Sequence, residues 1–457
     1  MRVASFASRP RGGRMPSRAA MTSSSAVGGT LTATRSTGTA PLGVSFEVTG
    51  NGEFNDARTW DFGDTGAGTW AISGLSKNAE TDGAVVAHVF ETAGSYTVSV
   101  SGLTIGITVD DPNTVFSGAN TICVSPSANY TGAPGDATLQ TSLPSSYAGK
   151  RVLLHRGESF GSISPLNTDS GFQVGAYGTG ADPIVTSVGT GMVSGVSSWT
   201  NDWTIMDIDA GNVSISATTY RFLMYRCTAD TVNGVSIVDI GSAVGYYYAN
   251  VSGAETIPWP REIFLVDNTL TGVVNATNEP AVVLMGSFLK SGIMGNSINL
   301  ATEHTTRIWS ASKTFIGHND LGGVHYDGGA PPGIRHAFKM HSGGVQDYGT
   351  IFSDSPTPAT SKVVIAYNHL GDSAYNGSWI SQVSPQNTLE TEGIEDVLIV
   401  GNAFERGPYT SSDMQLRGRR MTWRGNTVVG GGSVNIARSG STYPSGLDAW
   451  DGPYTSE

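Results

Sequence analysis

Residues 397–402 read Val-Leu-Ile-Val-Gly-Asn, a short apolar strand that ends in glycine and asparagine, and this pattern recurs through the second half of the chain. Five other segments share it: 263–268 (IFLVDN), 292–296 (GIMGN), 314–319 (TFIGHN), 363–368 (VVIAYN) and 421–426 (MTWRGN). In chain order, the six asparagines are separated by 28, 23, 49, 34 and 24 residues. Because 49 is close to two periods and 34 is one period plus an insertion, the spacing predicts a repeat of about 24 residues.

A repeat of this length predicts a solenoid of stacked coils. One coil of short strands cannot close a core alone, and stacking similar coils buries the inward residues continuously. An asparagine at the same bend of each coil can bond its counterparts above and below, which satisfies backbone groups in the turn. The pattern resembles the right-handed parallel β-helix of pectate-lyase-like enzymes and phage tailspikes. We assign residues 111–457 to it, although such a fold does not by itself specify a function.

The composition agrees with an all-β chain and excludes some partners. The 457 residues include 60 glycines, with 39% hydrophobic and 14% charged residues, and show little helical periodicity. A net charge of -12 argues against nucleic acid, because phosphate contacts need clustered lysine and arginine. No run of 18 apolar residues occurs, so we expect no membrane span.

Residues 29–110 carry a second set of motifs. They are Ala40-Pro41-Leu42 before a strand, Trp60-Asp61-Phe62-Gly63-Asp64, and His88-Val89-Phe90 leading to Gly94-Ser95-Tyr96-Thr97-Val98. Together they resemble the polycystic-kidney-disease (PKD) repeat domain, which implies an immunoglobulin-like β-sandwich. The middle of the module, residues 66–85, is longer than is usual in that family. Members of the family act as spacers or as modules beside carbohydrate-acting domains in surface and secreted proteins.

Residues 1–28 are expected to be a basic flexible or docking segment. The first 20 residues carry five arginines and no acidic residue, which suits docking to an acidic partner such as another virion protein. No apolar stretch follows these arginines, so no signal peptide is recognisable. We therefore expect a virion protein or an extracellular protein that leaves the cell by lysis or as part of a particle.

Candidate catalytic residues lie in a histidine-rich stretch with inserted loops around residues 322–360. Five of the eight histidines fall within the 38 residues from His304 to His341. If residues 335–342 form a strand, Arg335, Lys339 and His341 share one face. Such a row suits an anionic sugar, because elimination from a uronate needs a cation on the carboxylate and a base for the α-proton. Arg335 would supply the cation and Lys339 or His341 the base, as in some β-helix lyases.

Aromatic and polar residues around the inserted loops are the expected sugar contacts, since aromatic faces stack on sugar rings. The predicted substrate-binding residues are His325, Tyr326, Asp327, Trp309, Tyr348 and Trp379. A hydrolase would instead need two facing carboxylates, for which Asp320, Asp327, Asp347 and Asp354 are candidates without a marked pair. The histidines fit no known metal-ligand motif. No cofactor is expected, and calcium is left open without a motif for it.

Two functions fit these observations. The favoured one is a virion or surface-exposed β-helix protein, resembling a phage tailspike or tail-fibre component, that recognises host glycan. The alternative is a secreted polysaccharide lyase or glycoside hydrolase acting on acidic polysaccharide, with a lyase favoured over a hydrolase. Whether the chain is an enzyme is left open, as is assembly into a homotrimer.

Overall fold

The computed structural model describes most of the chain from residue 28 onward. The described residues are 28–166, 168–189, 201–215, 219–230, 238–240, 260–272, 282–301, 304–322, 336–340, 360–371, 378–380, 394–405, 414–416, 419–429 and 434–435.

The amino-terminal module is a β-sandwich. One sheet is antiparallel and contains β1 (Thr30–Ala33), β3 (Leu42–Thr49) and β6 (Val85–Phe90). The other contains, in spatial order, β2 (Thr37–Thr39), β8 (Leu103–Asp110), β7 (Gly94–Val100), β4 (Thr59–Asp61) and β5 (Ala79–Thr81). Phe46, Trp60, Phe62 and Val98, which come from both sheets and the segment after β4, are buried in the same core.

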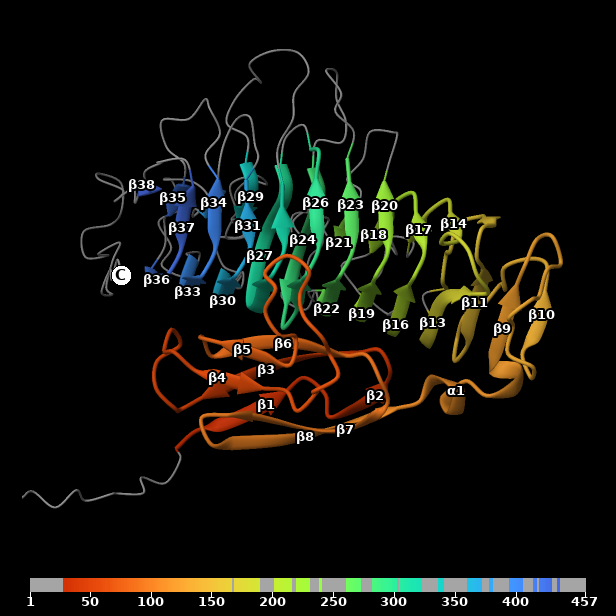
Figure 1. Ribbon diagram of the computed structural model, residues 1–457, viewed down its shortest axis with the longest axis horizontal. Helices are drawn as coiled ribbons and strands as arrows, with labels where there is room; N and C mark the ends of the chain where they lie inside the picture. Colours follow the sequence, from red (N-terminus) through yellow and green to blue (C-terminus); the bar gives the residue numbers. More distant parts are fainter. Residues whose placement is uncertain are drawn as a thin grey trace, which may run out of the picture.

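A short link leads from the sandwich to the solenoid. It contains α1 (Pro112–Val115), whose first turn is capped by the Asp111 side chain, which accepts from the Asn113 N–H at 2.8 Å. The 3-10 turn η1 (Gly118–Asn120) follows. Figure 1 shows that this link turns the chain around at one end, so that the coils stack back alongside the sandwich.

The rest of the described chain forms stacked coils whose strands build three parallel sheets. The first sheet contains β10 (Thr138–Gln140), β9 (Thr121–Val124), β11 (Arg151–His155), β13 (Ser170–Tyr177), β16 (Asn201–Met206), β19 (Tyr220–Tyr225), β22 (Arg261–Val266), β25 (Gly292–Met294), the second half of β27 (His304–Gly317), β30 (Thr360–Ala366), β33 (Ile394–Val400) and β36 (Arg419–Arg424). The second sheet contains β15 (Val188–Gly189), β18 (Val213–Ile215), β21 (Val238–Ile240), β24 (Val282–Leu289), the first half of β27, β29 (His336–Met340), β32 (Ser378–Ile380), β35 (Met414–Leu416) and β38 (Val434–Asn435). The third contains β12 (Ser159–Phe160), β14 (Ile184–Val185), β17 (Asp209–Ala210), β20 (Thr228–Asp230), β23 (Thr269–Thr271), β26 (Ser297–Asn299), β28 (Asp320–Leu321), β31 (His369–Leu370), β34 (Ala403–Glu405) and β37 (Thr427–Val429). The expected fold class, an N-terminal β-sandwich followed by a right-handed parallel β-helix, is confirmed.

The interior of the β-helix is one continuous apolar cluster that runs from Ile122 to Met421. Aromatic rings contact one another from coil to coil near its beginning, with ring centres 5.2 Å apart for the stacked pair Phe172 and Trp203 and 4.4 Å apart for the tilted pair Trp203 and Phe222. Each coil therefore depends on its neighbours to exclude water from its inward residues.

The repeated asparagines form the predicted ladder. The side-chain Nδ2 of Asn268 donates to Oδ1 of Asn296 at 2.9 Å, and the same bond continues through Asn319, Asn368 and Asn402 to Asn426 at 2.8–2.9 Å. From Asn296 onward, each Oδ1 also accepts from the backbone N–H of the preceding ladder asparagine, at 2.8–3.0 Å. The ladder from Asn268 to Asn402 is fully buried, so these bonds replace water at the corner between the first and third sheets.

The sandwich lies along the outer face of the first sheet instead of extending the solenoid end to end (Figure 1). Phe264, Val364 and Leu398 point outward from that sheet and are fully buried in the sandwich core cluster. The approach is close enough that a Cβ added at Gly292 would lie 2.8 Å from the Cβ of Ala87. Polar contacts lie at the margin, where Glu47 accepts from Lys313 at 2.6 Å and from Lys362 at 3.0 Å.

We predict that Asn402→Ala lowers the free energy of unfolding by about 1–3 kcal/mol, because buried partners above and below lose their hydrogen bonds. Asn120→Ala is the matched control, since the Asn120 side chain is exposed and, among the described residues, bonds only the half-buried Lys150 side chain. Chemical denaturation of both variants measures the difference. Equal midpoints would show that the ladder does not stabilise the coils.

Candidate functional site

A line of paired residues crosses the second sheet at one register position. Adjacent strands pair Met285 with Arg307, Arg307 with Lys339, Lys339 with Trp379, and Trp379 with Gln415. We call these five positions the Lys339 row. Phe338 and Met340 are fully buried in the core, so strand alternation places Lys339 between them on the outer face, where it is half-buried. Met285, Arg307 and Lys339, all half-buried, therefore lie on the outside of the coils, and Trp379 and Gln415 continue the same register positions.

Two of the predicted site residues, Lys339 and Trp379, are thus at neighbouring positions of this row. Trp309 is off the row, because it is the extra residue where β27 shifts register against β24. The remaining predictions lie outside the described residues, and the site stays a prediction for them: Arg335, His341, His325, Tyr326, Asp327 and Tyr348.

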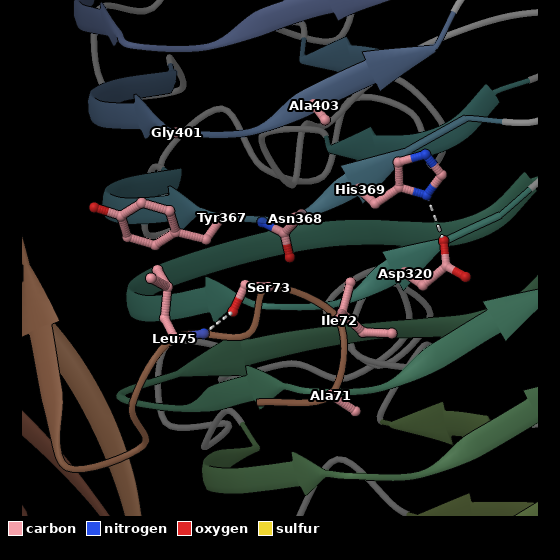
Figure 2. A pocket seen from close by; sticks show the side chains of 10 residues that line it. All are labelled: Ala71, Ile72, Ser73, Leu75, Asp320, Tyr367, Asn368, His369, Gly401 and Ala403. Carbon is pink, nitrogen blue, oxygen red and sulfur yellow. Dashed lines mark hydrogen bonds and ion pairs between the residues drawn. The ribbon is translucent and has the colours of Figure 1, made fainter. Parts of the chain in front are cut away.

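A second candidate site lies where the sandwich meets the β-helix. A pocket of about 630 Å³ is lined by a loop of the sandwich (Ala71, Ile72, Ser73 and Leu75) and by β-helix residues at the corner between the first and third sheets. The β-helix residues are Asp320, Tyr367, Asn368, His369, Gly401 and Ala403. Figure 2 shows the loop crossing over the strands, with His369 and Asp320 on one side and Tyr367 on the other. The loop belongs to the enlarged segment 66–85.

His369 carries an ion-pair cluster at this pocket. Its Nδ1 lies 2.8 Å from Asp320 Oδ1 and its Nε2 lies 3.0 Å from Glu405 Oε1. The hydrogen bond to Asp320 and then that to Glu405 outweigh burial and raise the pKa of His369 to about 9. At neutral pH the ring is therefore an imidazolium that donates to two carboxylates. The side chains of His369, Asp320 and Glu405 are each about a third exposed.

Of this cluster, only Asp320 was expected from the sequence, as one of four candidate carboxylates. His369 and Glu405 were missed. The signal was present, because Asp320 and His369 each follow a ladder asparagine directly, and residues at equal positions after the ladder must pair across coils.

Two further features concern ligands and membranes. Among the described residues, no group of three or more His, Cys, Asp or Glu side chains is arranged to hold a metal ion. In the same part of the chain, no helix is long and apolar enough to cross a membrane.

Comparisons with known proteins give little beyond this geometry. No protein-family model matches the chain, and no curated protein matches it. One solved structure that resembles it is the catalytic domain of a GH87 alpha-1,3-glucanase variant in complex with nigerose. The two share 9% sequence identity over 85% of this chain and 88% of that one, with a TM-score of 0.23. A likeness this slight carries no argument about function, and the resemblance to PKD domains and tailspikes remains a prediction from sequence.

We predict that His369 stabilises the fold in a pH-dependent way. Its folded pKa of about 9 lies above the ordinary value near 6.5, so its contribution is fully present below pH 6.5 and is lost as the pH rises through about 9. The difference in unfolding free energy between the wild type and His369→Gln should therefore be larger at pH 6 than at pH 10. Denaturation at both pH values checks this, and an NMR titration of the ring with a midpoint near 6.5 would contradict it.

Proposed function

We propose that this protein engages carbohydrate through the outer face of the second sheet, with the Lys339 row as the centre of the binding surface. The observation that carries the proposal is the register of Arg307, Lys339 and Trp379 on three successive strands. Two cationic residues next to an aromatic one are the residue types that recognise an acidic sugar, since cations bind carboxylates and aromatic faces stack on sugar rings.

The geometry of a parallel sheet suits a linear polymer. Successive strands of a sheet are about 4.8 Å apart, so a chain that runs along the solenoid axis meets an equivalent position on each coil. Along the solenoid axis, the residues of the Lys339 row are in order Met285, Arg307, Lys339, Trp379 and Gln415. A polysaccharide with acidic units is the ligand that fits such a series.

The proposal extends to the biological setting. We place the protein on a virion or another exposed surface, where the β-helix meets host glycan and the basic segment 1–28 docks to other virion proteins. The support is the charge distribution, because the first 20 residues contribute five arginines and no acidic residue to a chain whose total charge is -12, which leaves -12 - 5 = -17 for the rest. Copurification of the chain with particles tests the setting, and a chain found only free in the medium contradicts it.

Eliminative cleavage of the same polysaccharide is the second candidate function. Arg307 and Lys339 are paired across adjacent strands, which supplies a cation for the uronate carboxylate beside a base for the α-proton. A hydrolase is less favoured at the pocket, because Asp320 and Glu405 both pair with His369 and not with each other across an open space.

We predict that Lys339→Gln weakens binding to an acidic polysaccharide roughly tenfold or more, since a charge-assisted hydrogen bond of about 1.5–3 kcal/mol is lost. Lys290→Gln is the control, because it removes the same charge from an exposed turn outside the row. Isothermal titration with a uronate polymer and with a neutral polymer measures both variants. Equal weakening in the two variants would mean that only net charge matters.

If the protein is a lyase, the wild type should produce the absorbance of an unsaturated uronate from the same polymer, and Lys339→Gln should abolish it while Lys290→Gln should not. The reason is that elimination requires a base at the α-proton, whereas binding requires only the cation. Binding without any absorbance change in the wild type would restrict the function to recognition.

A further inference from the structure

Ser73, His318 and Glu80 form a hydrogen-bonded chain at the junction of the two modules. The Oγ of Ser73 lies 2.7 Å from Nδ1 of His318, and Nε2 of His318 lies 2.6 Å from Oε1 of Glu80. The serine and the glutamate come from the sandwich, and the histidine comes from the β-helix. Hydroxyl, imidazole and carboxylate in this order are the arrangement that activates a serine nucleophile.

The imidazole is held rigidly between two aromatic rings. Trp70 stacks on one face of His318 at 5.0 Å and 8°, and Tyr367 stacks on the other at 5.4 Å and 14°. The His318 side chain is 0% exposed and that of Glu80 is 2% exposed. Because the ring cannot turn, each nitrogen keeps its partner, which is the preorganisation that a general base requires.

One arrangement of protons suits a general base. With the tautomer that carries its proton on Nε2, His318 donates to the Glu80 carboxylate and its Nδ1 accepts from the Ser73 hydroxyl. The Oγ of Ser73 also accepts from the backbone N–H of Leu75 at 3.3 Å, which helps to hold the serine in place. In the familiar serine triad the serine faces Nε2 and the carboxylate faces Nδ1, and here the two nitrogens are exchanged. The exchange does not prevent base catalysis, because a general base needs one nitrogen with a lone pair while a carboxylate holds the N–H of the other nitrogen.

The serine is also reachable from solvent. Ser73 is half-buried and lines the pocket of about 630 Å³, together with the exposed apolar side chains of Ile72 and Leu75 (Figure 2). The polar side of the same pocket carries Asp320 and His369.

We propose that Ser73 is the nucleophile of an acyl-ester hydrolase site, with His318 as its general base and acid and Glu80 as the residue that positions His318. Ser73 Oγ attacks the ester carbonyl carbon while its proton passes to Nδ1 of His318. The C–O bond to the alcohol then breaks, and the alcohol leaves with that proton. Water attacks the acyl-serine, again through His318, and releases the carboxylic acid and the free serine.

The pocket indicates a short acyl group on a polar alcohol. Ile72 and Leu75 offer a small apolar surface for the acyl chain, and the carboxylate of Asp320, which is about a third exposed, offers an acceptor for hydroxyl groups. An O-acylated sugar has this chemistry. The assignment of the alcohol as a sugar rests on the proposed function, but the assignment of ester cleavage does not.

The test uses the full chain with a fluorophosphonate probe and with p-nitrophenyl acetate, neither of which contains a sugar. We expect the probe to label Ser73, as located by peptide mass spectrometry. We also expect Ser73→Ala to abolish the label and to lower esterase turnover roughly 100-fold or more, because both the nucleophile and its base are needed. Ser76→Ala is the matched control, since Ser76 is an exposed serine of the same loop and should keep both activities. No label on Ser73 in the wild type, or equal labelling of Ser73 and Ser76, overturns the proposal.

A second variant tests the positioning role of Glu80. In Glu80→Gln the negative charge that stabilises the imidazolium is lost, so acylation should slow and its rate should reach half-maximum at a lower pH. An unchanged pH–rate profile would leave Glu80 with only a structural role and would contradict its assignment. Failure of these tests leaves the Lys339 row untouched, because polysaccharide binding is measured separately, with variants on another face.

Discussion

The ladder of buried asparagines is the constraint on which the rest of the structure depends. Each asparagine bonds the next through both its side chain and its backbone N–H, so neighbouring coils have one register at this corner. The bend also fixes the residue before each asparagine in the left-handed region. At Gly295, Gly401 and Gly425 this φ of 57–67° costs little, because glycine has no Cβ.

At three bends the left-handed residue is not glycine, and these three residues contact the sandwich. Asp267, His318 and Tyr367 have φ values of 53–59°, which are unfavourable for side chains of this kind. Asp267 accepts from Lys77 at 2.6 Å, His318 bonds Ser73 and Glu80, and Tyr367 bonds Thr81. The strain at these three bends thus coincides with polar contacts to the sandwich. A triad at this junction is consistent with strained positions clustering at functional sites.

The sequence allowed the solenoid to be predicted because its cause is local and repeated. Asn368 and Asn402 occupy equal positions in an apolar pattern, and that pattern alone implies stacking. The position of the sandwich could not be predicted in this way. Phe264 and Leu398 alternate as strand residues should, and nothing in their spacing shows that the outward ones are covered by another module. His318 was part of a recognised histidine cluster, but its partners Ser73 and Glu80 lie more than 200 residues earlier, so only the packing of the modules brings them together.

The packing of the two modules also decides which surfaces can meet a ligand. The outer face of the first sheet is apolar and is covered by β3 and β6 of the sandwich, so it is not available to a polymer. The Lys339 row lies on the second sheet, away from that contact, and the pocket with Ser73 lies where the sandwich loop reaches the third sheet. A polymer held along the second sheet therefore need not pass the triad, and the two sites can act on different parts of one ligand or on different ligands. Both sites depend on the ladder, because it fixes how the coils stack. The same stacking aligns Arg307 with Lys339 on the second sheet and Asp320 with His369 on the third sheet.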